Sequence, residues 1–303
     1  MLRLTDIPNC GAFAALTPLD KGWSPDEKYR VETCDGKRLL LRVADIDRYD
    51  DKKTAYAMME RAAALGVPMS LPVDFGVCGG GKNVYMLLTW LDGVDAEELL
   101  PGLSRAERYA LGTKAGELLR TFHTLPAPDD AKPWGERFRR KLEERIGFYN
   151  ANPVKCANGD KLIRFLTDNQ GLLDNRPQTF HHGDFNASNL IVLPDGRIGA
   201  IDFNAFNSDH GDPWWELCFT EWGVEPDASF YSGLYDGYFT PETPPRGFFV
   251  TLRYYFAYDA LAALCDTSEG VQGEPEDGRR HAENVLRWFS DMKEIIPEWY
   301  SRY

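Results

Sequence analysis

The stretch His181–Asn189 reads HHGDFNASN and determines how this chain is interpreted. Two β-like runs follow it, at 190–193 and 197–203, and the residues between them, Pro194–Gly196, are of the types that form hairpin turns. The second run contains the residues IDFN at 201–204. A polar loop, a hairpin and a strand-ending aspartate in this order predict a site where their polar side chains meet.

The spacing His-x-Asp-x-x-x-x-Asn, followed by a hairpin and a second aspartate, is the arrangement that phosphoryl transfer needs. The loop would hold Asp184 toward an incoming hydroxyl group. Asn189 and Asp202 offer hard oxygen ligands, which suit Mg²⁺ bound to nucleotide phosphates. The alternative is that these residues only form turns. The combination of loop, hairpin and second aspartate favours the functional interpretation.

The charge of the chain restricts its partners. Lys and Arg number 34 and Asp and Glu 47, so the net charge is −13, with a pI near 4.9. Such a chain is a poor ligand for polyanions, and we expect neither nucleic acid nor membrane as a partner, whereas a cationic small molecule is attracted. No apolar run approaches the length of about 18 residues that a membrane-spanning helix needs, so we expect no segment to span a bilayer. The six cysteines are scattered, so we expect a protein of the reduced cytoplasm. The sequence leaves open whether it is a monomer or a homodimer.

The first part of the chain is predicted to be a small sheet with one helix. Asp35-Gly36 is a strong hairpin signal, and Gly66 and Pro68 end the helix. The predicted strands are 29–33, 38–43, 71–77 and 84–90, and the predicted helix is 49–65.

From residue 92 onward the apolar residues follow a helical period. Ser104 and Glu107 form a capping box that opens a helix to about residue 125. Further helices are predicted at 134–149, 213–222, 246–266 and 279–295, with Pro297 ending the last. The chain therefore divides into an N-terminal lobe of residues 1–91 and a helical lobe of residues 92–303, and a cleft between them is the expected ligand site.

These motifs resemble the aminoglycoside phosphotransferase family, small-molecule kinases that share the protein-kinase fold. The resemblance continues through Gly211–Leu217, GDPWWEL, and covers nearly the whole chain. It implies an α+β, two-lobed fold: a small antiparallel-sheet lobe with one helix, and a larger helical lobe with an embedded hairpin. It also implies that Asp184 is the catalytic carboxylate, that Asn189 and Asp202 hold Mg²⁺, and that ATP or GTP is the donor.

The resemblance places Arg42 where the family has the strand lysine that contacts the α- and β-phosphates. Arginine can bind phosphate in a bidentate manner and keeps its charge. The family pairs this cation with a helix glutamate, but the matching position here is Ala55. Glu60 lies five residues further, about 140° around the helix. What orients Arg42 is therefore left open.

Other nucleotide contacts are predicted more generally. The loop 20–24, DKGWS, lacks a Gly-x-Gly-x-x-Gly pattern, but Gly22 and Ser24 can donate hydrogen bonds to phosphate. Thr89 and Leu91 lie at the predicted junction of the lobes, where backbone groups would meet the nucleobase.

The acceptor is expected to be a small molecule rather than a protein. The segment between Asp202 and Gly211 is too short for an activation segment with a peptide platform, and position 186 is Asn where Ser/Thr protein kinases have lysine. In the family, acidic residues of the helical lobe bind substrate ammonium groups. The candidates here are Glu216, Glu221, Glu225, Asp227 and Asp259.

The sequence thus predicts a kinase that phosphorylates a hydroxyl group of a cationic, aminoglycoside-like or amino-sugar acceptor. Because Ala260 stands where the family has a carboxylate, antibiotic resistance is not presumed. A choline or amino-alcohol kinase is the first alternative, with aromatic residues such as Trp214 and Trp215 as a cage for a quaternary ammonium. A non-catalytic nucleotide-binding regulator is the second. We interpret His123, His182 and Asp212 as structural residues.

Overall fold

The computed structural model describes residues 6–8, 10–19, 25–152, 157–204, 209–220, 226–268 and 274–301. The chain forms two compact units. The first unit comprises residues 1–99 and 182–209, and the second comprises residues 100–181 and 210–303. The loop and hairpin that follow residue 181 thus belong to the same compact unit as the N-terminal sheet. The predicted lobe boundary at residue 91 stays a prediction.

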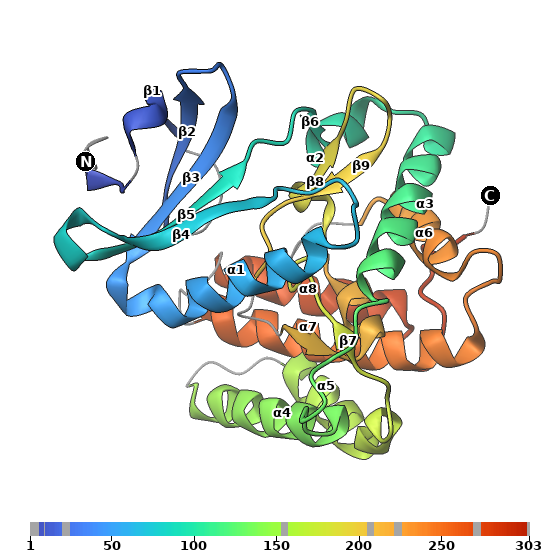
Figure 1. Ribbon diagram of the computed structural model, residues 1–303. Coiled ribbons are helices and arrows are strands. Elements are labelled where there is room, and N and C mark those ends of the chain that lie inside the picture. Colours follow the sequence, from blue (N-terminus) through green and yellow to red (C-terminus); the bar gives the residue numbers. More distant parts are fainter. Residues whose placement is uncertain are drawn as a thin grey trace. The chain divides into compact units, whose positions relative to one another are not determined.

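The first unit is built on a five-stranded antiparallel sheet in the order β1-β2-β3-β5-β4 (Figure 1). In its register Lys28 lies opposite Arg42, and Arg42 lies opposite Met86. Helix α1 packs against β4 and β5. The bounds are β1 Phe13–Leu19, β2 Glu27–Thr33, β3 Arg38–Asp45, α1 Tyr49–Ala63, β4 Pro72–Cys78 and β5 Asn83–Thr89.

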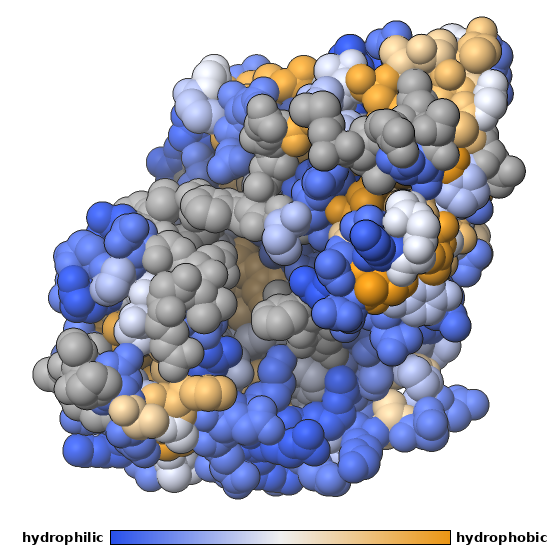
Figure 2. Space-filling model, turned by 90° about the vertical axis from the view of Figure 1, so that its left-hand side faces the viewer, coloured by the Kyte–Doolittle hydropathy of each residue, from blue (hydrophilic) through white to orange (hydrophobic). Residues whose placement is uncertain are grey.

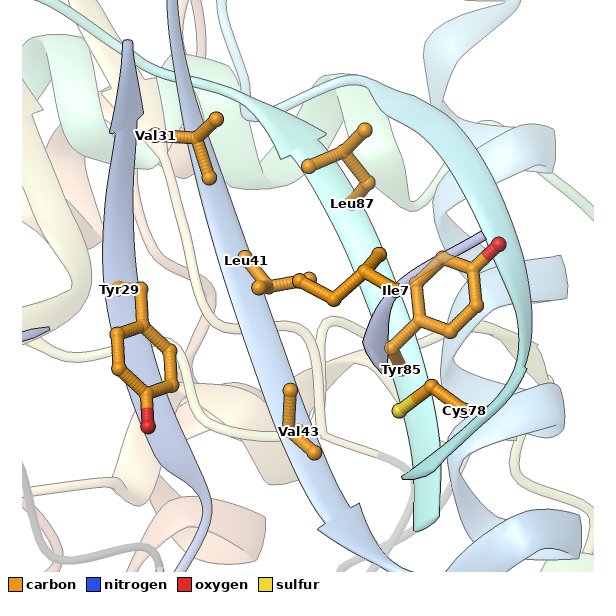
Figure 3. Close-up of a cluster of buried hydrophobic side chains, with 8 residues drawn as sticks. All are labelled: Ile7, Tyr29, Val31, Leu41, Val43, Cys78, Tyr85 and Leu87. Atoms are coloured by element: carbon orange, nitrogen blue, oxygen red, sulfur yellow. The ribbon is translucent and has the colours of Figure 1, made fainter. Parts of the chain in front are cut away.

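A hydrophobic cluster lies on one face of this sheet (Figure 3). Because side chains alternate between the faces of a strand, Leu41 and Val43 point into the cluster while Arg42 points to the other face. That second face carries α1, whose buried residues include Ala55 and Lys52. The cluster consists of Ile7, Tyr29, Val31, Leu41, Val43, Cys78, Tyr85 and Leu87.

The predicted hairpin is present, and a short strand extends it to a three-stranded sheet in the order β6-β8-β9. Its strands are β6 Val94–Asp95, β8 Leu190–Val192 and β9 Ile198–Ala200. Strand β9 ends at Ala200 rather than at residue 203. Asp202 therefore lies beyond the strand, with a left-handed φ of 61°.

The second unit is mainly helical, with a two-stranded sheet in which β7 (Thr179–Phe180) pairs with β10 (His210–Gly211). The capping box of Ser104 and Glu107 is formed as predicted. The helices are α3 Arg105–Phe122, α4 Trp134–Ala151, α5 Ala157–Asp168, α6 Ala228–Phe239, α7 Arg246–Ser268 and α8 Pro275–Trp288.

Helices α3 and α6 approach each other closely through glycines. A Cβ atom on Gly112 would lie 1.9 Å from the carbonyl oxygen of Phe230, and one on Gly116 would lie 2.1 Å from that of Leu234. Conversely, a Cβ atom on Gly233 would lie 2.1 Å from the carbonyl oxygen of Tyr109. Any larger residue at these positions would force the two helices apart.

Several predicted elements differ from the structure. The helix predicted at 213–222 is a 3₁₀ helix, Pro213–Cys218, and the helix predicted at 279–295 is α8, which ends at Trp288. Residues Ser290, Asp291 and Met292 then have positive φ angles, which end the helix well before Pro297. Strand β1 and helices α5 and α6 are not among the predicted elements.

The surface view of Figure 2 is largely hydrophilic, with hydrophobic colours in separate areas. Exposed large hydrophobic residues include three in or next to β4, namely Leu71, Val73 and Val77. Within the described ranges, no helix is both long enough and apolar enough to cross a bilayer.

Candidate active site

The loop that carries Asp184 is held by His182. The Nε2 atom of His182 lies 3.0 Å from the carbonyl oxygen of Ile201, so Nε2 donates, and Nδ1 accepts from the amide of Asp184 at 3.3 Å. The ring is fully buried and packs against Phe185 and Phe203. His182 thus ties the loop to the backbone of Ile201, directly before Asp202, and has the structural role that the sequence predicts.

The close approach of this loop to the backbone around Asp202 requires a glycine at position 183. Its φ is +89°, and a Cβ atom there would lie 1.7 Å from the carbonyl oxygen of Asn204. The amide of Asn204 in turn donates to the carbonyl oxygen of His182 at 2.9 Å. The backbone on either side of Asp202 therefore lies directly against the loop, and a side chain at position 183 would separate them.

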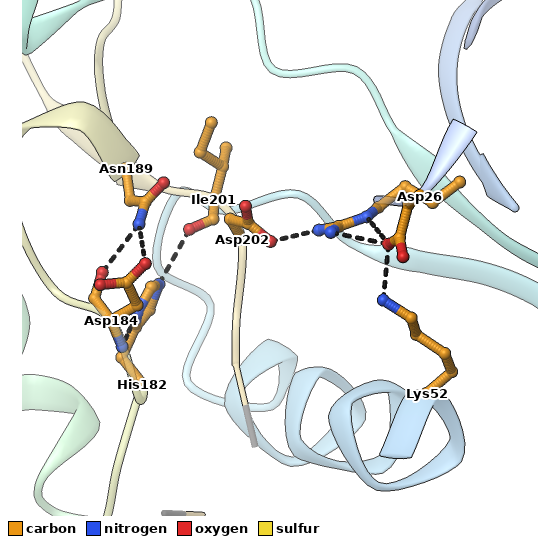
Figure 4. Close-up of polar contacts among 8 residues, drawn as sticks. Asp26, Lys52, His182, Asp184, Asn189, Ile201 and Asp202 are labelled. Atoms are coloured by element: carbon orange, nitrogen blue, oxygen red, sulfur yellow. Dashed lines mark hydrogen bonds and ion pairs between the residues drawn. The ribbon is translucent and has the colours of Figure 1, made fainter. Parts of the chain in front are cut away.

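Two amide side chains fix the orientation of Asp184. Asn186 Nδ2 donates to Asp184 Oδ1 at 2.9 Å. Asn189 Nδ2 donates to Asp184 Oδ2 at 2.9 Å (Figure 4). Asn189 Nδ2 also donates to the backbone carbonyl of Asp184 at 2.9 Å. Because its nitrogen is turned toward Asp184, the side-chain oxygen of Asn189 points away from that carboxylate.

The hairpin brings Asn189 next to the strand end. The amide of Ile201 donates to the carbonyl oxygen of Asn189 at 3.0 Å, which continues the ladder of β8 and β9 by one pair. Asp202 follows immediately, and its positive φ turns the chain there. The structure thus brings together the loop, Asn189 and Asp202 as the sequence predicts, although Asp202 lies just after the strand rather than within it.

Arg42 of β3 binds two carboxylates. Its Nη1 atom contacts Oδ1 of Asp202, and its Nε and Nη2 atoms donate to Oδ2 of Asp26 at 3.1 and 2.9 Å. Lys52 of α1 also donates to Oδ2 of Asp26, at 2.5 Å (Figure 4). Ala55 is buried at 6% exposure, whereas Glu60 is exposed. The carboxylate that orients Arg42 therefore comes from the residue before β2, not from helix α1.

The charges in this group shift one another's pKa values. Burial alone would raise the pKa of Asp202, but the charge and hydrogen bond of Arg42 outweigh it and lower that pKa. Lys28, opposite Arg42 in the sheet, has its pKa lowered by burial and by the charge of Arg42. Asp202 is thus held as a carboxylate beside an excess of positive charge.

The side chains of Asn189 and Asp202 match the chemistry of Mg²⁺, because an amide oxygen and a carboxylate are hard oxygen donors. In the described part of the chain, no cluster of three or more His, Cys, Asp or Glu side chains is arranged to hold a metal ion. Mg²⁺ retains waters and takes phosphate oxygens, so two protein ligands are compatible with it.

The remaining predicted nucleotide contacts are placed as follows. Gly22 and Ser24 lie outside the described residues. Thr89 ends β5, and both its amide and its hydroxyl group pair with the backbone of Leu71, at 2.9 and 2.8 Å. The side chain of Leu91 lies against Gly199 of the hairpin. Contact of Thr89 or Leu91 with a nucleobase stays a prediction.

The predicted substrate carboxylates have structural partners where they are described. Glu216 is 1% exposed and binds Nε2 of His123 at 2.9 Å, and Asp259 is 8% exposed and binds Nε2 of His281 at 2.8 Å. Asp227 caps helix α6 and pairs with Arg108 at 2.8 Å. Each of these three carboxylates thus has a partner within the protein, and its role in acceptor binding stays a prediction. Glu221 and Glu225 lie outside the described residues.

Asp26 and Lys52 are the site residues that the sequence does not reveal. No motif marks them, and they reach Arg42 only because the β2–β3 register places the start of β2 beside the end of β3. Asp26 is 8% exposed, which makes it a deeply buried carboxylate at a strand start. The feature that marks Asp26 is the burial of its charge, and burial can be seen only in the folded structure.

Several solved structures share the fold of this chain. Aminoglycoside phosphotransferase APH(4)-Ia is 17% identical, with a TM-score of 0.62, over 92% of this chain and 96% of that one. A choline/ethanolamine kinase family protein from Mesorhizobium loti is 16% identical, with a TM-score of 0.66, over 96% and 95%. An amicoumacin kinase in complex with AMP-PNP, Ca²⁺ and amicoumacin is 14% identical, with a TM-score of 0.61, over 93% and 90%.

At these identities the similarity shows a shared fold. A comparison with curated proteins gave no match. The family model described as the phosphotransferase enzyme family matches residues 15–249, which include the sheet, the loop of Asp184 and the hairpin. The chain belongs to this family of phosphotransferases, whose acceptors are alcohol groups.

Proposed function

We propose that the protein transfers the γ-phosphoryl group of ATP to a hydroxyl group of a small cationic acceptor, of the aminoglycoside-like or amino-sugar class. One observation carries the proposal. A carboxylate oriented by two amide groups (Asp184) and an Arg–carboxylate pair (Arg42 and Asp202) are held in one compact unit by the loop and hairpin.

Asp184 is proposed to orient the acceptor hydroxyl and to take its proton. The hydrogen bonds from Asn186 and Asn189 hold each of its oxygens in a defined direction. A carboxylate can accept more bonds than these two, so it can also accept one from a hydroxyl group. Positioning of this kind supplies a large part of the acceleration in phosphoryl transfer.

Asn189 and Asp202 would hold Mg²⁺, which, when bound, neutralises phosphate charge. Arg42 would contact the α- and β-phosphates. Its Nε and Nη2 atoms donate to Asp26, so Nη1, which contacts Asp202, would be the donor turned to the phosphates. ATP is proposed rather than GTP because the amicoumacin kinase structure holds AMP-PNP, an ATP analogue.

The cationic acceptor rests on the net charge of −13, which attracts cations. It also agrees with the aminoglycosides that one structural neighbour is named for. The aromatic cage of the choline alternative is not favoured: Trp215, Tyr231, Tyr235 and Tyr238 are buried, and the guanidinium of Arg176 lies 3.7 Å from the ring centre of Trp214.

The test is a screen of ATP consumption with aminoglycosides, amino sugars, choline and amino acids, each run with wild type and with Asp184→Asn. The variant keeps the size of the side chain but not its basicity. On the true acceptor we expect the variant to turn over about 10²–10⁴-fold more slowly. Its affinity for ATP should stay unchanged, as measured by calorimetry.

The same screen separates the alternatives. Turnover of choline alone would replace the proposed acceptor class with amino alcohols. Tight ATP binding without turnover on any acceptor would favour a nucleotide-binding regulator. Equal turnover by wild type and Asp184→Asn would remove Asp184 from the mechanism.

A further inference from the structure

Arg42 is the phosphate-binding cation of the proposed function, and its guanidinium group has two differently used sides. Nε and Nη2 both donate to Asp26 Oδ2, at 3.1 and 2.9 Å. Nη1 points instead to Asp202. Because the guanidinium is planar and rigid, fixing the first side also fixes the direction of Nη1.

Asp26 binds a second cation with the same oxygen. Lys52 Nζ lies 2.5 Å from Asp26 Oδ2, so three nitrogen donors converge on one atom. The side chains of Asp26, Arg42 and Lys52 are 1%, 8% and 10% exposed. Charged groups this deeply buried keep their charge only when they are paired.

The charged side chains around Arg42 carry a net positive charge. Around Arg42, three cations (Arg42, Lys52 and Lys28, the last on the same face of the sheet) face two carboxylates, Asp26 and Asp202. The excess is positive, as the phosphates of ATP require. A helix glutamate at position 55 would reduce it, whereas the helix here supplies a lysine one turn earlier.

We propose that Asp26 is the positioning residue for Arg42 in nucleotide binding, and that Lys52 holds Asp26 and thereby links helix α1 to the phosphate site. The usual arrangement is thus reversed: the carboxylate precedes a strand and the helix provides a cation. This inference rests on the proposed function, because it needs a nucleotide whose phosphates Arg42 contacts.

The test compares two probes, Mg²⁺-ATP and adenosine, which lacks phosphates. With Asp26→Asn we expect the dissociation constant for Mg²⁺-ATP to rise about 10- to 100-fold, the range expected for a lost charge-assisted hydrogen bond. Adenosine affinity, measured by competition, should change less than about twofold. In an Arg42→Gln background, Asp26→Asn should have little further effect, because it acts through Arg42.

The matched control is Asp74→Asn, another partly buried aspartate of the same sheet, whose carboxylate accepts from Tyr85 Oη at 2.7 Å. It should leave the affinity for both probes unchanged. If Asp26→Asn alone does not fold, the measurement is made with Asp26→Asn/Lys52→Met, in which one buried cation is removed as well.

Equal affinity of wild type and the Asp26 variants for Mg²⁺-ATP would overturn the inference while leaving the proposed function intact. An equal loss of ATP and adenosine affinity would also overturn it, because Asp26 would then only support the fold. Failure of the wild-type protein to bind ATP would instead refute the proposed function, and this inference with it.

Discussion

Nη1 of Arg42 donates a hydrogen bond to Oδ1 of Asp202, although the two residues are 160 positions apart in the sequence. The cation proposed to bind phosphate and the carboxylate proposed to bind metal thus neutralise each other in this structure. Binding of Mg²⁺-ATP is expected to exchange this contact for two others, between Asp202 and the metal ion and between Arg42 and phosphate. The exchange avoids an unpaired charge at either residue.

Asp202→Asn should therefore affect nucleotide binding in opposite ways with and without metal. In Mg²⁺ the affinity for ATP should fall at least about tenfold, because a carboxylate ligand is lost. In EDTA the affinity should stay the same or rise, because Arg42 no longer has Asp202 as a competitor for phosphate. Calorimetry under both conditions gives the comparison, and an unchanged affinity in Mg²⁺ would reject the metal role.

Gly183→Ala should destabilise the protein by about 2–5 kcal/mol, because the methyl group collides with Asn204 and the backbone angle is left-handed. Gly36→Ala is the matched control. Gly36 has a similar φ of +82° but no atom within 4 Å of the added carbon, so only the conformational cost of about 1–2 kcal/mol remains. Urea unfolding measures both, and equal losses would mean that the loop can move away from Asn204.

Asp212→Asn should cost about 3–5 kcal/mol of stability, since it breaks a buried ion pair. Asp212 is fully buried and accepts from Arg176 at 2.6 and 2.9 Å and from Tyr255 Oη at 2.6 Å. Asp174→Asn tests a solvent-exposed pair with Arg139 and should cost less than about 1 kcal/mol. A similar small loss for both variants, measured by urea unfolding, would contradict this view of Asp212.

The stability of the protein should fall at mildly acidic pH because of His181. Burial lowers the pKa of His181 to about 4, from about 6.5 for an ordinary histidine. The unfolded chain therefore binds a proton more readily than the folded one, and stability is lost as the pH falls from about 6.5 to about 4.

Between pH 7 and pH 5, this residue should account for about 2 kcal/mol of the decrease in unfolding free energy. His181→Gln, which can still donate a hydrogen bond, should show a correspondingly smaller decrease in urea unfolding at the two pH values. An identical pH dependence of wild type and variant would exclude His181 as the cause.

The parts of the site that the sequence predicts are local in the chain. Asp184, Asn189 and Asp202 are separated by a short loop and a hairpin, so turn residues and spacing are enough to bring them together. Asp26 is different, because its partners lie on β3 and α1 and no spacing rule connects them. Its role depends on strand register, which a single sequence does not specify.

Whether a helix can be predicted also depends on signals within its own segment of the chain. The capping box of Ser104 marks the start of α3 directly. Helix α6 shows no amphipathic pattern, because every residue from Ser229 to Tyr238 is buried and this stretch has no polar face. Helix α5 does carry a signal, with Leu162 and Leu166 buried one turn apart. The substrate residues are chosen as acidic residues of the helical lobe, by resemblance to the family; Glu216 and Asp259 are buried, and their role in acceptor binding stays a prediction.

The glycine contacts between α3 and α6 restrict how the second unit can deform. Shear motions of packed helices proceed by small sliding of side chains past one another. At Gly112, Gly116 and Gly233 the two backbones are so close that no layer of side chains exists to slide. We expect hydrogen exchange to be slowest in this helix pair, so that conformational change during a catalytic cycle would have to occur elsewhere in the molecule.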